Sequence, residues 1–293
     1  MLTRYAPSPT GHLHLGHVVN AIYVWGLAGA AGGRVLLRIE DHDRIRCRPE
    51  YESSILEDLE WLGFEPDEGL RPLVRQSDRD ALYRDALDRL RRTSHVYACE
   101  CSRKHLAGER YDGFCRERRL TEARGRGLRV RFAEGIERFD DLHIGAVEQE
   151  PARQCGDLLV RDRDGNWTYQ FAVTVDDMTQ GVTDIIRGED LISSTGRQLR
   201  LRRMLGGTET PRFFHHPLIL KPGGEKLSKS ASDSGVRELR QAGLSPAEVI
   251  GRAAATVGLI DRPEPLAARD IAGVFREPTD VQRGGRIRRA SSP

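Results

Sequence analysis

The spacing of apolar residues at the start of the chain changes from that of a strand to that of a helix and back. Residues 2–6 end at a Pro-rich turn and predict a short strand. Residues 15–31 are rich in Val, Ala and Leu and predict a buried helix, and residues 34–40 (RVLLRIE) predict a second strand. Together they predict a βαβ unit, which is the building block of parallel sheets.

Regular patterns continue along most of the chain but are interrupted in its middle. Between residues 94 and 165, Arg-rich turns and short alternating runs predict an insertion with a small fold of its own. A regular apolar pattern resumes at residues 169–175. Further elements are predicted as helices over 50–63, 78–93 and 190–205, a strand over 216–220, and helical structure from Lys229 to about 260.

Size and composition place the chain among globular proteins. With 293 residues, 38% of them hydrophobic, it can build a full core without disulfide or metal staples. No window of about 18 residues is apolar and free of charge, which argues against a membrane span. The first residues lack the pattern of a secretory signal, so we expect a cytoplasmic location. A net charge of +2 does not by itself indicate nucleic-acid binding.

The basic residues are divided very unequally between lysine and arginine. Only four of the 46 are lysines, and three of these fall between Lys221 and Lys229. A chain that otherwise uses arginine keeps lysine where a compact ammonium group is needed. The segment Lys226-Leu-Ser-Lys-Ser230 follows a Pro-Gly-Gly turn, and such a loop can close over a triphosphate and stabilise the charge of a departing pyrophosphate.

A second candidate site lies between the first strand and the first helix, in the segment from Pro7 to His17 (PSPTGHLHLGH). Ligands of doubly wound sheets bind at the carboxyl ends of strands, and the N-terminus of a helix favours phosphate. His14 and His17 fall in the first turn and can donate to phosphate oxygens, while Gly16 leaves room for a base against the backbone. The alternative is an ordinary turn with surface histidines.

These two segments resemble the paired signatures of class I aminoacyl-tRNA synthetases, His-x-Gly-His and Lys-x-Ser-Lys-Ser. The resemblance implies a Rossmann-type catalytic domain that uses ATP with Mg²⁺ and has no protein nucleophile. It implies that the catalytic residues are His14, His17, Lys226 and Lys229. The residues it implies for ATP binding are Pro7, His14, Gly16, His17, Lys226, Ser228 and Lys229.

Further segments resemble the glutamate-specific members of that class: RYAPSPTG from Arg4, RIED from Arg38, VDD from Val175 and GVTDIIRGED from Gly181. This resemblance implies an amino-acid pocket formed by Arg4, Ser8, Glu40, Tyr169 and Arg187. The chemistry agrees, because arginines pair with the two carboxylates of glutamate and Glu40 can hold its ammonium group. The alternative is structural, with RIED ending a buried strand in a salt bridge and Tyr169 in the core.

The length of the chain distinguishes two relatives within that class. Only 63 residues follow Ser230, whereas the resemblance to full glutamyl-tRNA synthetases implies a long helical domain there that reads the anticodon. The shorter glutamyl-queuosine tRNA(Asp) synthetase family is the better match. It implies activation of L-glutamate by ATP and transfer to the queuosine base of tRNA(Asp), and we expect a monomer. The alternatives are a truncated enzyme that charges a tRNA 3′ end, a non-catalytic tRNA-binding module and a plain nucleotidyltransferase.

Three of the five cysteines form a cluster in the sequence: Cys99, Cys101 and Cys115. Three thiolates suit Zn²⁺, and a structural zinc ion suits a small insertion that lacks a large core. The family pattern implies Tyr111 as the fourth ligand, whereas His105 and His95 are chemically plainer candidates. Buried free thiols are the alternative. Cys47 and Cys155 are expected to be ordinary residues.

These expectations divide the chain into five parts. They are the first half of the Rossmann catalytic domain (1–92), a zinc-bearing insertion (93–165), the second half with the lysine loop (166–232), a helical C-terminal region (233–275) and a flexible basic tail (276–293).

Overall fold

The βαβ unit predicted at the start of the chain is confirmed. The computed structural model describes residues 1–102, 110–219 and 235–275. Strands β1 (Leu2–Tyr5) and β2 (Arg34–Leu37) pair in parallel, and α1 (Leu15–Ala30) connects them. The second strand ends three residues before the predicted boundary at residue 40.

Two later strands lie beside this parallel pair and belong to a second, four-stranded sheet. Strands β8 (Asp184–Gly188) and β9 (Arg212–His216) pair in parallel. β8 lies next to β1, since the Thr183 amide donates to the Leu2 carbonyl at 2.9 Å. The predicted strand at 216–220 is wrong: β9 lies four residues earlier and ends at His216. Pro217 follows it and has no amide hydrogen to donate to a neighbouring strand.

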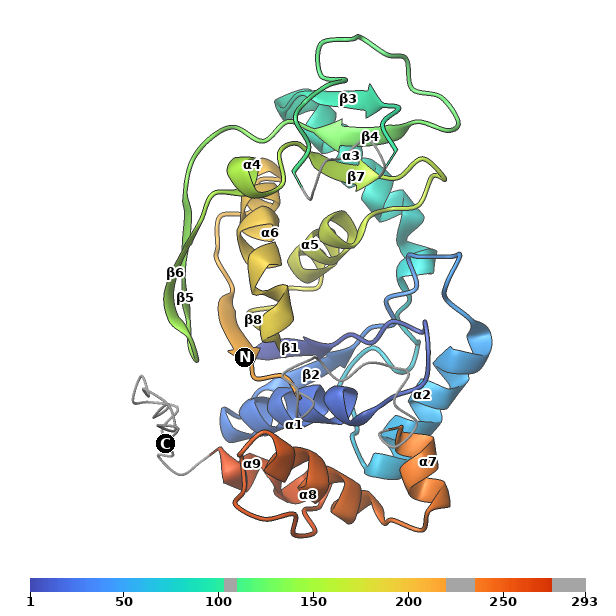
Figure 1. The fold of residues 1–293 in the computed structure, drawn as a ribbon, viewed down its shortest axis with the longest axis vertical. Helices are drawn as coiled ribbons and strands as arrows, with labels where there is room; N and C mark the ends of the chain where they lie inside the picture. Colours follow the sequence, from blue (N-terminus) through green and yellow to red (C-terminus); the bar gives the residue numbers. More distant parts are fainter. Residues whose placement is uncertain (103–109, 220–234, 276–293) are drawn as a thin grey trace, which may run out of the picture.

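The insertion contributes to two different sheets (Figure 1). Strands β3 (Val96–Cys99), β4 (Gly127–Val130) and β7 (Leu158–Arg161) form a separate antiparallel sheet. The hairpin of β5 (Glu137–Asp141) and β6 (Gly145–Gln149) instead joins the sheet of β8 and β9, in which Asp141 lies opposite Phe213 of β9. The short helix α4 (Pro151–Gln154) follows the hairpin. The insertion therefore reaches the sheet that carries the candidate site.

The predicted helices are confirmed with small shifts at their ends. They are α2 (Pro49–Leu62), α3 (Asp80–Thr93) and α6 (Ile192–Met204). The apolar run that starts at Tyr169 is the helix α5 (Tyr169–Thr179), and three-residue to four-residue 3₁₀ turns precede α3 and α6 at Gln76–Arg79 and Glu189–Leu191. Helices α3 and α5 pack with the antiparallel sheet in a second apolar core around Phe171.

The C-terminal region covers the outer side of α1 (Figure 1). Helices α7 (Val236–Gln241) and α8 (Pro246–Thr256) confirm the helical pattern predicted to about residue 260. The 3₁₀ turn Ala268–Asp270 and α9 (Ile271–Val274) lie in the rest of the predicted helical region, for which no separate element was predicted. Gly26 permits close packing here, because a Cβ atom on it would lie 2.1 Å from the Phe275 ring. No helix among the described residues is long and apolar enough to span a membrane. The basic tail lies outside the described residues.

Candidate active site

The N-terminus of α1 is organised by the two histidines of the first candidate site. Nδ1 of His14 accepts from the Gly16 amide, and the His14 amide donates to Nδ1 of His17, both at 3.1 Å. This reciprocal pair caps the helix, and the two ring centroids lie 4.0 Å apart. The positive end of the helix dipole and both imidazoles therefore face the same region, which suits a phosphate group.

The second candidate segment, with Lys226, Ser228 and Lys229, lies outside the described residues. The described chain resumes at Gly235, which forms a β-bridge with His14.

A cavity of about 590 Å³ brings most of the predicted site residues together. It lies at the carboxyl ends of the parallel strands, where ligands bind in doubly wound sheets. From the predicted set it is lined by Arg4, His14, Gly16, His17, Glu40, Tyr169 and Arg187. The lining residues that carried no prediction include Asn20, Asp190, Leu218 and His216.

Two predicted residues lie beside this cavity and do not line it. The Pro7 carbonyl accepts from the Glu40 amide at 2.9 Å, so Pro7 fixes the backbone of a lining residue. Ser8 lies with its Oγ 3.9 Å from Sγ of Cys47. Cys47 was expected to be ordinary, and burial raises the pKa of its thiol.

A buried network of charges holds Arg4 and Glu40 in place. Nε of Arg4 lies 3.2 Å from an Asp177 carboxylate oxygen, and its Nη1 donates to the Ile186 carbonyl at 3.2 Å. Arg38 is fully buried and donates to Glu40 at 2.9 Å and to Asp177 at 2.8 Å. Burial works to raise the pKa of Asp177, but the charges of Arg4 and Arg38 lower it overall. Asp177 is therefore ionised.

A second buried carboxylate supports the network from behind. Asp176 accepts from Gln76 at 2.8 Å, from Arg79 at 2.6 Å and from the Tyr83 hydroxyl at 2.9 Å. It also lies 3.7 Å from Nε of Arg38. No role was predicted from the sequence for Arg38, Asp176 or Asp177. The signal was present, since charged residues inside apolar runs that form a strand and a helix have to be paired in the interior.

Arg187 differs from the buried arginines Arg4 and Arg38. It is 3% exposed and donates to Gln198 and Thr195 at 2.8 Å and to Nε2 of His215 at 3.1 Å. None of the described carboxylates forms an ion pair with it. Burial lowers its pKa, but an arginine stays protonated in proteins. Among the described residues, this buried positive charge of the cavity therefore has no carboxylate in contact, which suits a carboxylate ligand.

Tyr169 and Glu40 complete the side of the cavity that faces Arg187. Tyr169 is the first residue of α5, and burial raises the pKa of its hydroxyl. Glu40 forms the salt bridge with Arg38 that the structural alternative expected, and it lines the cavity as well. The structural and the functional interpretation of the RIED segment thus describe the same arrangement.

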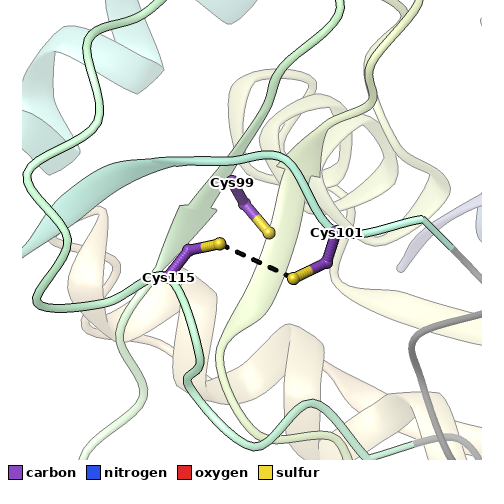
Figure 2. Close-up of side chains that lie close together, drawn as sticks. All are labelled: Cys99, Cys101 and Cys115. Carbon is purple, nitrogen blue, oxygen red and sulfur yellow. Dashed lines mark hydrogen bonds between the residues drawn. The ribbon is translucent and has the colours of Figure 1, made fainter.

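The three clustered cysteines meet in space, as Figure 2 shows. The sulfur atoms of Cys99, Cys101 and Cys115 lie within 4.8 Å of one another, and those of Cys101 and Cys115 are 3.5 Å apart. Burial raises the pKa of the Cys101 thiol to about 12, and a bound cation would favour its thiolate form. The set of donors can hold a zinc ion.

Tyr111 lies in the same cluster. Its hydroxyl is 3.6 Å from Sγ of Cys99 and accepts from the Cys115 amide at 2.7 Å. Arg129 donates to Sγ of Cys99 at 3.4 Å, and its guanidinium lies 3.8 Å from the centre of the Tyr111 ring. This positive charge favours anionic sulfur and phenol ligands. His95 is exposed and is not part of the cluster, and His105 lies outside the described residues.

The sequence of the chain matches one known protein family. Residues 1–252 match the family described as tRNA synthetases class I (E and Q), catalytic domain. The chain belongs to this family. The resemblance found in the sequence and the Rossmann-type α/β fold are thereby confirmed, and the chain is a ligase of the aminoacyl-tRNA synthetase type. ATP with Mg²⁺ is the nucleotide substrate that this class implies.

Relatives of two names are similar to this class I synthetase. The Glutamyl-Q tRNA(Asp) synthetase of Symbiobacterium thermophilum is 42% identical, over 95% of this chain and 95% of the relative. The Glutamate--tRNA ligase of Nitratidesulfovibrio vulgaris is 43% identical over 85% of this chain, but over only 56% of the relative. Both support a synthetase that activates glutamate.

A solved structure agrees with the sequence comparison. The crystal structure of a glutamate tRNA ligase from Elizabethkingia meningosepticum, in complex with its amino acid, has a TM-score of 0.78 and 27% identity to this chain. The alignment covers 96% of this chain and 65% of the ligase. This class I synthetase thus spans just under two thirds of that solved relative.

Proposed function

We propose that this class I synthetase activates L-glutamate with ATP and transfers the glutamyl group to the queuosine base of tRNA(Asp). The observation that carries the first half is the charge distribution of the cavity. Arg187 is buried, positively charged and without a carboxylate partner among the described residues, and Glu40 lines the same cavity. A ligand with an anionic side chain and an ammonium group complements both.

The proposed reaction needs positioning and charge stabilisation more than it needs a reactive side chain. The α-carboxylate of glutamate attacks the α-phosphorus of ATP, the bond to the β-phosphate oxygen breaks, and pyrophosphate leaves with Mg²⁺. His14 and His17, at the positive end of α1, would bind the phosphates. Lys226 and Lys229 are proposed from the sequence alone to stabilise the charge of the departing pyrophosphate.

Relatives support the proposed acceptor. The Glutamyl-Q tRNA(Asp) synthetase of S. thermophilum aligns over nearly its whole length with this chain, whereas the glutamate--tRNA ligase of N. vulgaris aligns over about half of its own. The second half of the reaction is then attack by a hydroxyl of the queuosine base on the glutamyl carbonyl, with AMP as the leaving group. Charging of a tRNA 3′ end is the competing proposal.

We also propose that the insertion holds one structural zinc ion. Cys99, Cys101 and Cys115 are the proposed ligands, with the Tyr111 hydroxyl as the fourth. The ion would join β3 to the loop after it, in a part of the chain with few other buried apolar residues. No chemical step of the reaction is assigned to it.

Glutamate-dependent exchange of pyrophosphate into ATP tests the first step. We expect exchange in the absence of tRNA, as the short family implies. Exchange that appears only with tRNA(Glu) would instead favour a truncated glutamyl-tRNA synthetase, and no exchange under any condition would contradict glutamate activation.

Transfer of labelled glutamate tests the second step, with two forms of one tRNA as the matched control. We expect label on tRNA(Asp) that carries queuosine and none on tRNA(Asp) that lacks it. Equal labelling of both forms, or labelling of tRNA(Glu), would show that the 3′ end is the acceptor.

A further inference from the structure

Behind Arg187 lies a histidine that touches no part of the cavity. His215 is fully buried on β9, and its Nε2 lies 3.1 Å from Nε of Arg187 and 3.2 Å from Oγ1 of Thr195. An arginine has donors only, so Nε2 of His215 has to be the acceptor. The histidine therefore carries its proton on Nδ1.

The proton on Nδ1 has a carboxylate acceptor. Oδ2 of Asp141 lies 2.6 Å from Nδ1 of His215 and also accepts from the His215 amide at 3.1 Å. The other oxygen, Oδ1, accepts from the amides of His143 and Ile144 at 2.9 Å. Burial works to raise the pKa of Asp141, but hydrogen bonds from His215 and these amides lower it overall. Asp141 is thus held in one position as an anion.

Asp141, His215 and Arg187 form a line that ends at the cavity. We propose that Asp141 and His215 are positioning residues for glutamate binding, which hold the Arg187 guanidinium in place without neutralising its charge. The inference rests on the proposed function and deepens it. Neither residue touches the substrate in this arrangement.

The contrast with Arg4 gives the physical reason for an intervening imidazole. Nε of Arg4 is held directly by the carboxylate of Asp177, which supplies a countercharge. Nε of Arg187 is held by a neutral ring, and the nearest carboxylate of this line is on the far side of that ring. A carboxylate in direct contact would compete with the substrate for Arg187, whereas an imidazole fixes the guanidinium and leaves its charge for the ligand.

The remaining contacts of Arg187 agree with this role. Gln198 and Thr195 accept from Nη1 and Nη2 through neutral oxygens. With the bond from Nε to His215, three of the five N–H donors are used, all by uncharged acceptors. The Tyr169 hydroxyl is a further neutral partner of the guanidinium. The positive charge is thus left for a carboxylate ligand.

The source of Asp141 gives the arrangement a second consequence. Asp141 is the last residue of β5, in the hairpin that the insertion adds to the sheet of β8 and β9. Arg187 lies on β8 and His215 lies on β9. The insertion therefore contributes to the cavity indirectly, through the contacts from Asp141 to His215 and from His215 to Arg187.

The test replaces the His215 imidazole with side chains that can or cannot accept a hydrogen bond from Arg187. His215→Leu removes the acceptor, and we expect KM for glutamate in the exchange reaction to rise roughly 10- to 100-fold, with kcat and KM for ATP nearly unchanged. His215→Gln supplies an amide oxygen near the position of Nε2 and should recover most of the affinity. A KM for glutamate that stays at the wild-type value in His215→Leu would overturn the proposal, as would equal defects in the two variants.

The carboxylate has a matched pair of variants. Asp141→Asn removes the charge at nearly constant size, while Asp140→Asn changes the exposed neighbouring residue in the same way. We expect glutamate to bind several-fold more weakly to Asp141→Asn than to the wild type. Asp140→Asn should bind glutamate as tightly as the wild type. Nitrogen NMR of His215 should show a neutral ring protonated on Nδ1 in the wild type and a changed tautomer balance in Asp141→Asn. A ring protonated on Nε2 in the wild type would contradict the arrangement.

Calorimetric titration with glutamate alone separates this inference from the proposed function. A wild-type protein that does not bind glutamate would overturn both. If His215→Leu binds glutamate as tightly as the wild type, only the role of the positioning residues is overturned.

Discussion

Two buried arginines, Arg187 and Arg38, should respond in opposite ways to the same substitution. Arg187 and Arg38 are 3% and 0% exposed, yet Arg38 contacts three carboxylates and Arg187 contacts none among the described residues. We predict that Arg187→Met leaves the stability of the protein nearly unchanged and abolishes glutamate activation. Arg38→Met should instead destabilise the fold.

The magnitude for Arg187 follows from two opposing effects. Removal of a buried charge that has no countercharge relieves a desolvation cost of several kcal/mol. Three hydrogen bonds are lost, each worth about 1 kcal/mol, and their acceptors remain in the interior. The two effects nearly cancel, so the free energy of unfolding should lie within about 1 kcal/mol of the wild-type value or above it.

Arg38 lacks this compensation. Its loss leaves Glu40, Asp176 and Asp177 close together without the central guanidinium. Breaking a buried ion pair by removing one partner costs about 3–5 kcal/mol. We therefore expect a loss of that size in Arg38→Met.

Urea denaturation of both variants measures the free energy of unfolding, and the exchange reaction measures activity. For Arg187→Met we expect kcat/KM for glutamate to fall at least ~10²-fold, because a charged hydrogen-bonded pair with the substrate is lost. If Arg187→Met costs as much stability as Arg38→Met, Arg187 has a structural partner and our account of the pocket is wrong.

Three further outcomes are expected. Elemental analysis of the purified protein should find one zinc ion per chain. Cys115→Ser should lose this ion and the control Cys47→Ser should keep it. Zinc retained in Cys115→Ser would refute the proposed ligands. Burial raises the pKa of Asp58 to about 6. This folded-state pKa lies above the value in the unfolded chain, so the stability of the protein falls as pH rises from about 4 to about 6. Asp58→Asn should therefore stabilise the protein by about 1–3 kcal/mol more at pH 7.5 than at pH 4.5. An equal gain at both pH values, measured by urea denaturation, would contradict this prediction. Lys229→Ala should reduce adenylate formation by ~10²–10³-fold in the exchange assay, and wild-type turnover would exclude the lysine from the mechanism.

The elements with a strong local pattern were predicted well. The apolar run of 15–31 and its glycine end became α1, and the helical spacing of 50–63 became α2. The strand predicted over 216–220 was wrong because its apolar residues follow Pro217, while the strand itself is the aromatic run Arg212–His216. Helix α9 has four residues, too few to show a helical period.

The candidate site was predicted from motifs, and the structure brings most of its residues to one cavity. The motifs named residues that would contact ligands, and Arg4, Glu40 and Arg187 among them line this cavity. They did not reveal the residues that hold these in place. Asp177 and Asp141 lie in the sequence as two among many acidic residues, and only their partners distinguish them.

Local sequence determined the helices, the βαβ start, the signature segments and the cysteine cluster, because each depends on residues within a few positions of one another. Tertiary structure alone decided which charges are paired. Arg38 and Asp177 are 139 residues apart in the chain, and Asp141 and His215 are 74 apart. Such pairs form only when β8 lies beside β1 and the hairpin of the insertion lies beside β9. That strand order also leaves Arg187 without an ion pair to any described carboxylate, and glutamate recognition is proposed to depend on this.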